Sequence, residues 1–232
     1  MIDLYYFPTP NTWKVSIMLE ECGLPYTLKP VNITRGEQFE PAFLRISPNN
    51  RVPAIVDHAP PSELGSEPVS LFESGAILIY LADKTARFLA DDARQRYRTL
   101  QWLQWQMGGL GPMAGQYNHF KMVAPPNEYA LTRYTNEVRR LYGIMDSELK
   151  SHPYLAGEEY SIADMACWGW VSLYELQELD LTPFPKLWEW YERVAARPAV
   201  QRGRAAGKGL FDNAPPPSEE HRKRLYNPEP AR

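Results

Sequence analysis

The spacing of apolar residues changes near residues 84–92, and this change divides the chain into two parts. Before it, short apolar runs of strand length alternate with segments of helical length. After it, only helical spacing appears. One amphipathic helical face consists of Leu131, Tyr134, Val138, Leu141, Met145 and Leu149. We therefore predict an α/β domain over residues 1–84 and an all-helical domain over residues 92–210.

The predicted elements of the first domain follow the order βαβ and then ββα. Each predicted strand is a short β-prone run bounded by Pro, Gly or polar residues. Asn11 can cap the first helix and Gly23 can end it. The predicted strands cover residues 2–6, 26–33, 53–56 and 69–72, and the predicted helices cover residues 12–21, residues 41–46 and a run that starts at residue 73.

The second domain carries its own helix signals. Ser161 and Asp164 have the S-x-x-D spacing that resembles a capping box at a helix start. The glycines and proline of residues 108–112 are expected to kink or break the helix that begins near Asp91. Residues 185–197 begin with proline, which suits the first turn of a further helix.

Residues 211–232 form a separate segment that contains five prolines. Proline interrupts helices and removes a sheet hydrogen bond. We predict a disordered Pro-rich tail, with a strap laid over the protein surface as the alternative.

Composition excludes several classes of protein. Two cysteines are too few for a disulfide-rich scaffold or a cysteine-only metal cluster, and the four histidines lack metal-ligand spacing. The net charge of −3 offers no basic surface for nucleic acid. The longest apolar run, residues 75–81, is too short to span a membrane, and the N-terminus lacks a signal-peptide pattern. We therefore expect a cytoplasmic protein with reduced thiols and no metal.

Val52 and Pro53 form the first candidate binding feature. Pro53 lies between a polar loop and a strand, where it cannot donate a ladder hydrogen bond. A cis peptide bond would turn the backbone N–H and C=O of Val52 outward, where a peptide-like ligand could pair with them. Because cis bonds are uncommon, the local sequence alone favours an ordinary trans proline.

Glu73 and Ser74 form the second feature, at the start of a predicted helix. Helix N-termini attract carboxylates, and the Ser74 hydroxyl could bind one. Glu73 could bind a neighbouring ammonium, so that the pair would hold the α-amino acid end of a ligand. On local sequence alone a plain helix cap is the favoured interpretation.

Thr9 and Asn11 lie in the turn between the first strand and the first helix. A hydroxyl, an amide and a helix N-terminus in one turn lower the pKa of a thiol and hold a thiolate. Capping by Asn11 is the simpler alternative. Gln38, in the loop after the second strand, adds an amide that could contact a ligand, although loop glutamines are usually solvated.

These segments together resemble a glutathione transferase. The similarity is carried by TPN at residues 9–11, SPNNRVPAIVD at 47–57, FESGAILIYLA at 72–82 and YSIADMACW at 160–168. GEQF at 36–39 and LQWLQWQMGGLGPMAGQ at 100–116 resemble the nu class of disulfide-bond oxidoreductases. The resemblance covers about residues 1–208. It implies a thioredoxin-like domain with a mixed four-stranded sheet, an all-helical bundle domain, glutathione as co-substrate and a homodimer.

The resemblance gives the first-domain candidates their expected roles. Thr9 and Asn11 would be the catalytic residues at the glutathione sulfur. Val52, before a cis Pro53, would pair with the cysteinyl backbone of glutathione. Glu73 and Ser74 would then hold its γ-glutamyl end.

The remaining assignments depend on the same resemblance. Gln38 would lie near the glycyl end or a second tripeptide. Arg133 would reach glutathione from the helical domain, with a solvated helix arginine as the alternative. Asp164 resembles the family's helix-capping aspartate and would serve folding. The family commonly has glycine after the TPN asparagine, so Thr12 and Trp13 are expected to narrow the sulfur pocket.

The reactive sulfur is expected to belong to glutathione. Cys22 lies near the C-terminal end of a helix, where the dipole opposes a thiolate, and Cys167 lies in an apolar helix typical of an inert thiol. No C-x-x-C motif occurs. Tyr5 and Tyr6, which precede the turn, are interpreted as core residues.

The expected reaction is therefore reduction of a small disulfide. A bound glutathione thiolate attacks the disulfide, and a second glutathione resolves the mixed disulfide. One alternative is a transferase that conjugates glutathione to electrophilic small molecules. The other is a non-catalytic regulatory protein with the same fold.

Overall fold

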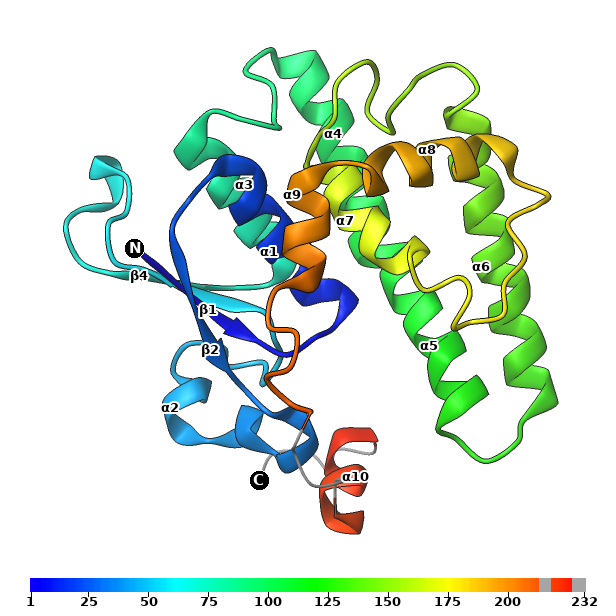
Figure 1. The fold of residues 1–232 in the computed structure, drawn as a ribbon, viewed down its shortest axis with the longest axis horizontal. Coiled ribbons are helices and arrows are strands. Elements are labelled where there is room, and N and C mark those ends of the chain that lie inside the picture. Colours follow the sequence, from blue (N-terminus) through cyan, green and yellow to red (C-terminus); the bar gives the residue numbers. More distant parts are fainter. Residues whose placement is uncertain (213–217, 227–232) are drawn as a thin grey trace. The chain divides into compact units, whose positions relative to one another are not determined.

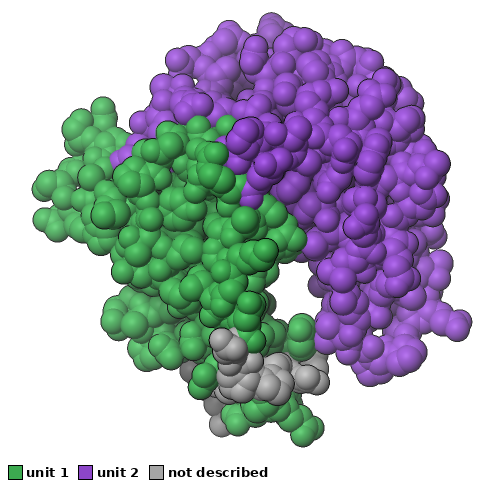
Figure 2. Space-filling view, viewed as in Figure 1, with its two compact units in different colours: residues 1–77, 202–232 green, residues 78–201 purple. Residues whose placement is uncertain are grey.

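A computed structural model describes residues 1–212 and 218–226, which form two compact units (Figure 2). The first unit contains Met1–Ile77 and the described residues from Arg202 onward, and the second contains Leu78–Gln201. The division falls between Ile77 and Leu78, inside the helix Ser74–Thr85, rather than at residues 84–92. Apolar spacing indicates the type of secondary structure, but it does not indicate the unit against which a helix packs.

The first unit contains a mixed four-stranded sheet in the order β2-β1-β3-β4 (Figure 1). β1 pairs in parallel with β2, β3 runs antiparallel to β1, and β4 runs antiparallel to β3. This arrangement confirms the predicted thioredoxin-like sheet. The strands are β1 (Ile2–Tyr6), β2 (Tyr26–Pro30), β3 (Ala54–Asp57) and β4 (Val69–Phe72).

The helices of the first unit follow these strands. β1 leads into α1 (Pro10–Cys22), and α1 ends at Gly23, whose positive φ of 64° suits a glycine C-cap. β2 is followed by the 3₁₀ turns η1 (Ile33–Arg35) and η2 (Glu37–Phe39) and by α2 (Pro41–Leu44). A third 3₁₀ turn, η3 (Ser62–Leu64), lies between β3 and β4, and α3 (Ser74–Thr85) follows β4.

The second strand is shorter than the predicted range of residues 26–33. The Val31 N–H still donates to the Tyr6 carbonyl at 2.9 Å. Asn32 then turns the chain, because its side-chain oxygen accepts hydrogen bonds from the N–H and the hydroxyl of Thr34. An Asn side chain that bonds its own backbone two residues on competes with strand pairing.

The second unit is helical, as predicted. Its first two helices are joined without a break by the π-helical turn η4 (Gln106–Leu110), so the glycine-rich segment changes the helical pitch rather than ending the helix. The helices are α4 (Ala93–Trp105), α5 (Gly111–Met122), α6 (Glu128–Glu148), α7 (Ile162–Val171) and α8 (Pro185–Ala195), and α9 (Pro198–Ala205) continues into the first unit.

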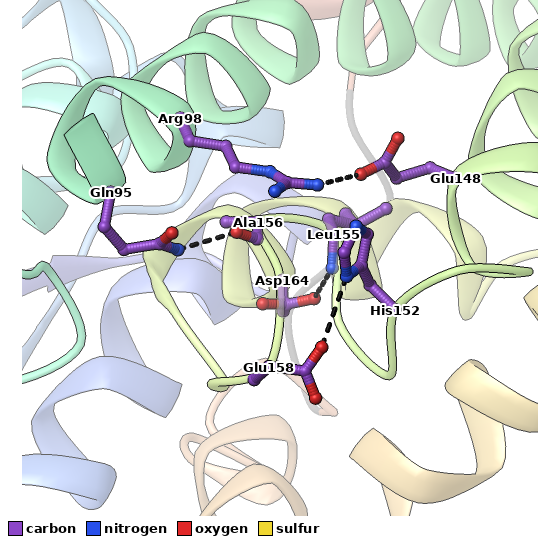
Figure 3. A network of polar contacts seen from close by, with 8 residues as sticks. All are labelled: Gln95, Arg98, Glu148, His152, Leu155, Ala156, Glu158 and Asp164. Atoms are coloured by element: carbon purple, nitrogen blue, oxygen red, sulfur yellow. Dashed lines mark hydrogen bonds and ion pairs between the residues drawn. The ribbon is translucent and has the colours of Figure 1, made fainter.

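Asp164 caps α7 and is completely buried. One carboxylate oxygen accepts from the Leu155 N–H at 3.0 Å and from Trp190 Nε1 at 2.8 Å, and the other accepts from the N–H and the hydroxyl of Ser161, each at 3.0 Å. Figure 3 shows the Asp164–Leu155 bond among neighbouring polar contacts of the second unit. The predicted capping box is confirmed. The carboxylate also connects α7 to the segment of Leu155 and to α8 through Trp190.

The C-terminal segment packs on the first unit. Gly203 lies so close to Ile17 of α1 that a side chain there would overlap the Ile17 backbone. The Arg204 guanidinium lies 3.4 Å from the ring centroid of Trp13, and the ring of Phe211 packs against Phe7. A last helix, α10 (Glu219–Tyr226), contacts η1.

Within the predicted tail, the Phe211–Phe7 ring pair and the contact of α10 with η1 favour the strap over the disordered tail for the described residues. A pair of packed rings offsets part of the loss of chain entropy that ordering requires. The remaining residues of the predicted Pro-rich tail, 213–217 and 227–232, lie outside the described residues.

Within the described part of the chain, no helix is long and apolar enough to cross a membrane. The same residues contain no group of three or more His, Cys, Asp or Glu side chains that could hold a metal ion.

Candidate functional site

Strand direction gathers the candidate residues of the first unit at one end of the sheet. β1, β2 and β4 all end there, and the antiparallel β3 begins there. The segments that follow or precede these strand ends carry the candidates Thr9, Asn11, Gln38, Val52, Pro53, Glu73 and Ser74. Residues that are up to 65 positions apart in sequence therefore share one edge, as in other open sheets whose ligands bind at strand ends.

The turn between β1 and α1 is capped by Thr9 rather than by Asn11. Thr9 has an extended backbone, and its Oγ1 accepts a hydrogen bond from the Thr12 N–H at 3.3 Å. Pro10 occupies the first helical position, where its missing N–H costs nothing, and this places the cap at Thr9, two residues before Asn11. Asn11 is the second helical residue and is half buried, so its amide does not have the capping role that the local sequence favoured.

The Val52–Pro53 peptide bond is cis, as the resemblance implied and against the expectation from local sequence. Pro53 is buried and Val52 is half buried, directly before β3. The Ser47 hydroxyl donates to the Arg51 carbonyl at 2.8 Å and closes the preceding loop. Because β3 begins only at Ala54, the backbone of Val52 lies beyond the ladder at the sheet end.

Glu73 and Ser74 join β4 to α3. The Glu73 carbonyl accepts from the Ile77 N–H at 2.9 Å, while its side chain is exposed and lies 3.5 Å from Asn49 Nδ2. Glu73 has a φ of 67°, a left-handed conformation that non-glycine residues rarely adopt and that is enriched at functional sites. Ser74 is buried at the first position of the helix.

Lys14 is a further candidate, which no local sequence pattern indicated. It lies on α1 with only 1% of its surface exposed, and its ammonium donates to the Ser74 hydroxyl at 3.3 Å. A buried lysine is uncommon unless it is paired. The sequence did not indicate this burial, because a lysine in a helix is ordinarily solvated. In the structure, however, all residues from 12 to 19 of α1 are buried.

Both helices that begin at this end contribute positive potential. The N-terminal turns of α1 and α3 lie at the positive ends of the two helix dipoles, which favour anions. Lys14 adds a hydrogen-bond donor beside α3, and the exposed Glu73 side chain provides a carboxylate. The combination suits a ligand with a carboxylate, an ammonium and a thiolate.

Gln38 is buried in η2 rather than solvated in a loop. Its surface is 1% exposed, and its Oε1 has no hydrogen-bond partner among the residues that the structure describes. A buried acceptor without a partner is costly, and this uncommon feature marks Gln38 as a candidate for a role beyond packing.

Arg133 belongs to the second unit. It is exposed on α6 and lines a pocket of about 660 Å³ between side chains of α5 and α6. The other lining residues are Met113, Tyr129, Thr132, Tyr134, Asn136, Glu137 and Arg140.

The two tyrosines before the turn are core residues, as predicted. Tyr6 is 1% exposed and donates its hydroxyl to the Ala206 carbonyl, and burial raises the pKa of Tyr6. Tyr5 points to the opposite face, where its ring lies 5.8 Å from that of Phe43. Trp13 was expected to narrow the sulfur pocket, but it is buried beneath Arg204.

Neither cysteine forms a disulfide within the described part of the chain. Cys22 is the last residue of α1, and Cys167 is completely buried in α7. Cys22 therefore lies about 16 Å along the helix from Asn11, at the end away from the candidate site.

Two family models match the chain. The glutathione S-transferase N-terminal domain matches residues 9–84, and the glutathione S-transferase C-terminal domain matches residues 111–198. The disulfide-bond oxidoreductase YfcG of Escherichia coli K12 is 54% identical over 201 residues, which cover 86% of this chain and 93% of that protein.

Solved structures show the same similarity. A glutathione transferase family member from Pseudomonas fluorescens Pf-5, with two glutathione bound, has a TM-score of 0.82 and 46% identity, over 88% of this chain and 92% of that chain. A glutathione transferase from Pseudomonas putida, with one glutathione disulfide bound per subunit, has a TM-score of 0.82 and 43% identity, over 88% and 91% of the two chains.

Proposed function

This chain belongs to the glutathione transferase family, and we propose that it reduces disulfide bonds with glutathione as the only reacting thiol. One observation carries the proposal. The edge of the sheet presents the N-termini of two helices together with hydroxyl, amide and carboxylate groups, whereas Cys22 lies at the opposite end of α1 and Cys167 is completely buried within the second unit. The relatives named above support it, since one is a disulfide-bond oxidoreductase and two hold glutathione or its disulfide.

The cysteinyl sulfur of glutathione lies at the turn that begins α1. Thr9 and Asn11 donate hydrogen bonds to it, and the N-terminal dipole of α1 favours its negative charge. A thiol pKa lowered by two units requires about 2.7 kcal/mol of preference for the thiolate. Two or three charge-assisted hydrogen bonds are sufficient for that preference.

The other parts of the tripeptide follow the sheet edge. The backbone of Val52 beside the cis Pro53 pairs with the cysteinyl backbone. Ser74 and the N-terminus of α3 bind the γ-glutamyl carboxylate, and Glu73 binds its ammonium. The amide of Gln38 binds near the glycyl end or a second tripeptide, and Arg133 also binds glutathione.

The reaction has two exchange steps. The glutathione thiolate attacks one sulfur of the substrate disulfide, the S–S bond breaks, and the other sulfur leaves as a thiolate that takes up a proton. A second glutathione thiolate attacks the glutathione sulfur of the mixed disulfide and releases the second substrate thiol. The substrate gains two electrons and two protons, and the two glutathiones become oxidised glutathione.

Replacing both cysteines, as Cys22→Ala with Cys167→Ala, is expected to leave disulfide reduction within about twofold of the wild-type rate, because neither thiol takes part in the exchange. The measurement is steady-state turnover of a small disulfide with reduced glutathione. Thermal unfolding and calorimetric binding of glutathione verify that the variant is folded. Loss of turnover in a folded variant that still binds glutathione would assign the reactive thiol to the protein and overturn the mechanism.

Replacing Glu73 with glutamine is expected to weaken glutathione binding about tenfold, since the exposed carboxylate loses its charge toward the γ-glutamyl ammonium. Calorimetry measures the change. A glutathione analogue that lacks the α-amino group should bind both proteins equally. Glu67→Gln, at an exposed position in the β3–β4 connection, is the matched control and should bind glutathione as the wild type does. Equal weakening of the analogue by Glu73→Gln would contradict the assignment.

The same site admits the two alternative functions, and simple assays separate them. Turnover of a chlorinated nitroarene without turnover of a small disulfide would make conjugation the main activity. Failure to bind glutathione or its disulfide in calorimetry would favour a non-catalytic protein.

We further propose that the protein works as a homodimer in a reducing cytoplasm on small disulfide substrates. Two cysteines that form no disulfide within the described residues support the reducing setting.

A further inference from the structure

Thr12 is a buried polar residue directly beneath the turn that carries Thr9. It is the third residue of α1, and none of its surface is exposed. Its N–H donates to Thr9 Oγ1 at 3.3 Å, and its own Oγ1 lies 3.1 Å from Thr9 Oγ1. The Thr9 hydroxyl therefore contacts both the backbone N–H and the hydroxyl of Thr12.

The burial of Thr12 determines which hydroxyl is the donor. Among the residues that the structure describes, Thr9 Oγ1 is the hydrogen-bond partner of the Thr12 hydroxyl. If Thr9 donated its proton, the buried Thr12 proton would be left without an acceptor, which is unfavourable. Thr12 is therefore the donor and Thr9 Oγ1 the acceptor.

The donor assignment leaves the Thr9 proton available. Thr9 Oγ1 has two lone pairs, and these accept the N–H and the hydroxyl of Thr12. Thr9 is only half buried, so a ligand at the sheet edge can accept its proton. A thiolate is an acceptor with no proton of its own, so it matches this arrangement.

We propose that Thr12 is a positioning residue for the thiolate site, because it directs the Thr9 proton toward the sulfur of bound glutathione. The inference rests on the proposed function. Without the Thr12 hydroxyl, the Thr9 hydroxyl can rotate and donate elsewhere, and part of its stabilisation of the thiolate is lost. Thr12 itself does not touch glutathione.

The test compares Thr12→Val, which removes the hydroxyl with little change of shape, with Thr12→Ser, which keeps it. The pH midpoint of thiolate formation is followed by the ultraviolet absorbance of bound glutathione and by the pH profile of kcat at saturating glutathione. Thr12→Val is expected to raise the midpoint by about 0.5 to 1 pH unit. Thr12→Ser is expected to restore the wild-type midpoint.

A double-mutant cycle tests the route through Thr9. Thr9→Val alone should raise the midpoint, and adding Thr12→Val to it should produce no further rise. The neighbouring charges of the first unit, Lys14 on α1 and Glu73 before α3, are the same in all variants, so their effects cancel.

Ser16→Ala is the matched control. Ser16 is also a fully buried hydroxyl on α1, but it donates to the Gly203 carbonyl at 2.7 Å, on the C-terminal segment, and should leave the midpoint unchanged. An unchanged midpoint in Thr12→Val, or additive shifts in the cycle, would overturn the inference while leaving the proposed function intact. Absence of any bound thiolate or turnover in the wild type would instead overturn both.

Discussion

Replacing Asn11 with alanine is expected to raise the pH midpoint of disulfide reduction by about 1 to 2 units. A hydrogen bond to a charged group contributes about 1.5–3 kcal/mol, and each pKa unit corresponds to 1.36 kcal/mol. Asn11 is half buried in the first turn of α1, at the sheet end where the thiolate is proposed to bind. Below the midpoint the variant should lose about ten- to a hundredfold in rate, because a smaller fraction of bound glutathione is ionised.

The pH dependence of the rate loss distinguishes weaker thiolate stabilisation from a general loss of activity. At alkaline pH both proteins hold glutathione as thiolate, so their rates should converge. Asn11→Asp should raise the midpoint further than alanine, since a second negative charge opposes the thiolate. The measurement is the pH profile of turnover together with the thiolate absorbance of bound glutathione. A rate loss that is equal at every pH would refute the proposed role of Asn11.

Replacing Asp164 with asparagine is expected to lower the free energy of unfolding by about 3–5 kcal/mol. The completely buried carboxylate accepts four hydrogen bonds from three segments of the second unit. An amide directs its NH₂ group toward backbone or indole donors in either orientation, so buried N–H groups lose their acceptor. Urea denaturation followed by circular dichroism provides the measurement.

Asp180→Asn is the control for this loss. Asp180 also accepts from a backbone N–H, that of Thr182 at 2.8 Å, but it is exposed, so water replaces the lost bond. Its denaturation midpoint should stay close to that of the wild type. A similarly small change in Asp164→Asn would show that the capping network is not a main source of stability.

Local patterns were sufficient for much of the fold and part of the site. The short β-prone run of residues 2–6 and the helical spacing after residue 91 depend on neighbours within a few positions, and both predictions are confirmed. The capping box of Ser161 and Asp164 is also local. The cis state of Pro53 was expected only through resemblance, because the surrounding structure, rather than its two residues, determines the isomer.

Burial was the property that local patterns did not reveal. Gln38 and Lys14 are polar residues in ordinary-looking segments, yet both are about 1% exposed. Thr12 is also completely buried, and the whole stretch of α1 from residue 12 to residue 19 is buried with it. Packing from segments distant in sequence, such as Gly203 and Arg204 against α1, produces this burial.

The sequence by itself determined that the protein has few thiols and no paired cysteine motif, and it determined the order and type of the main elements. Only the tertiary structure decided that Thr9, Gln38, Val52 and Ser74 share one sheet edge and that Thr12 supports Thr9 there. The physical reason is that composition counts residues without regard to their positions, and periodicity compares residues only a few positions apart. Strand direction, register and burial, in contrast, depend on pairings across the whole chain.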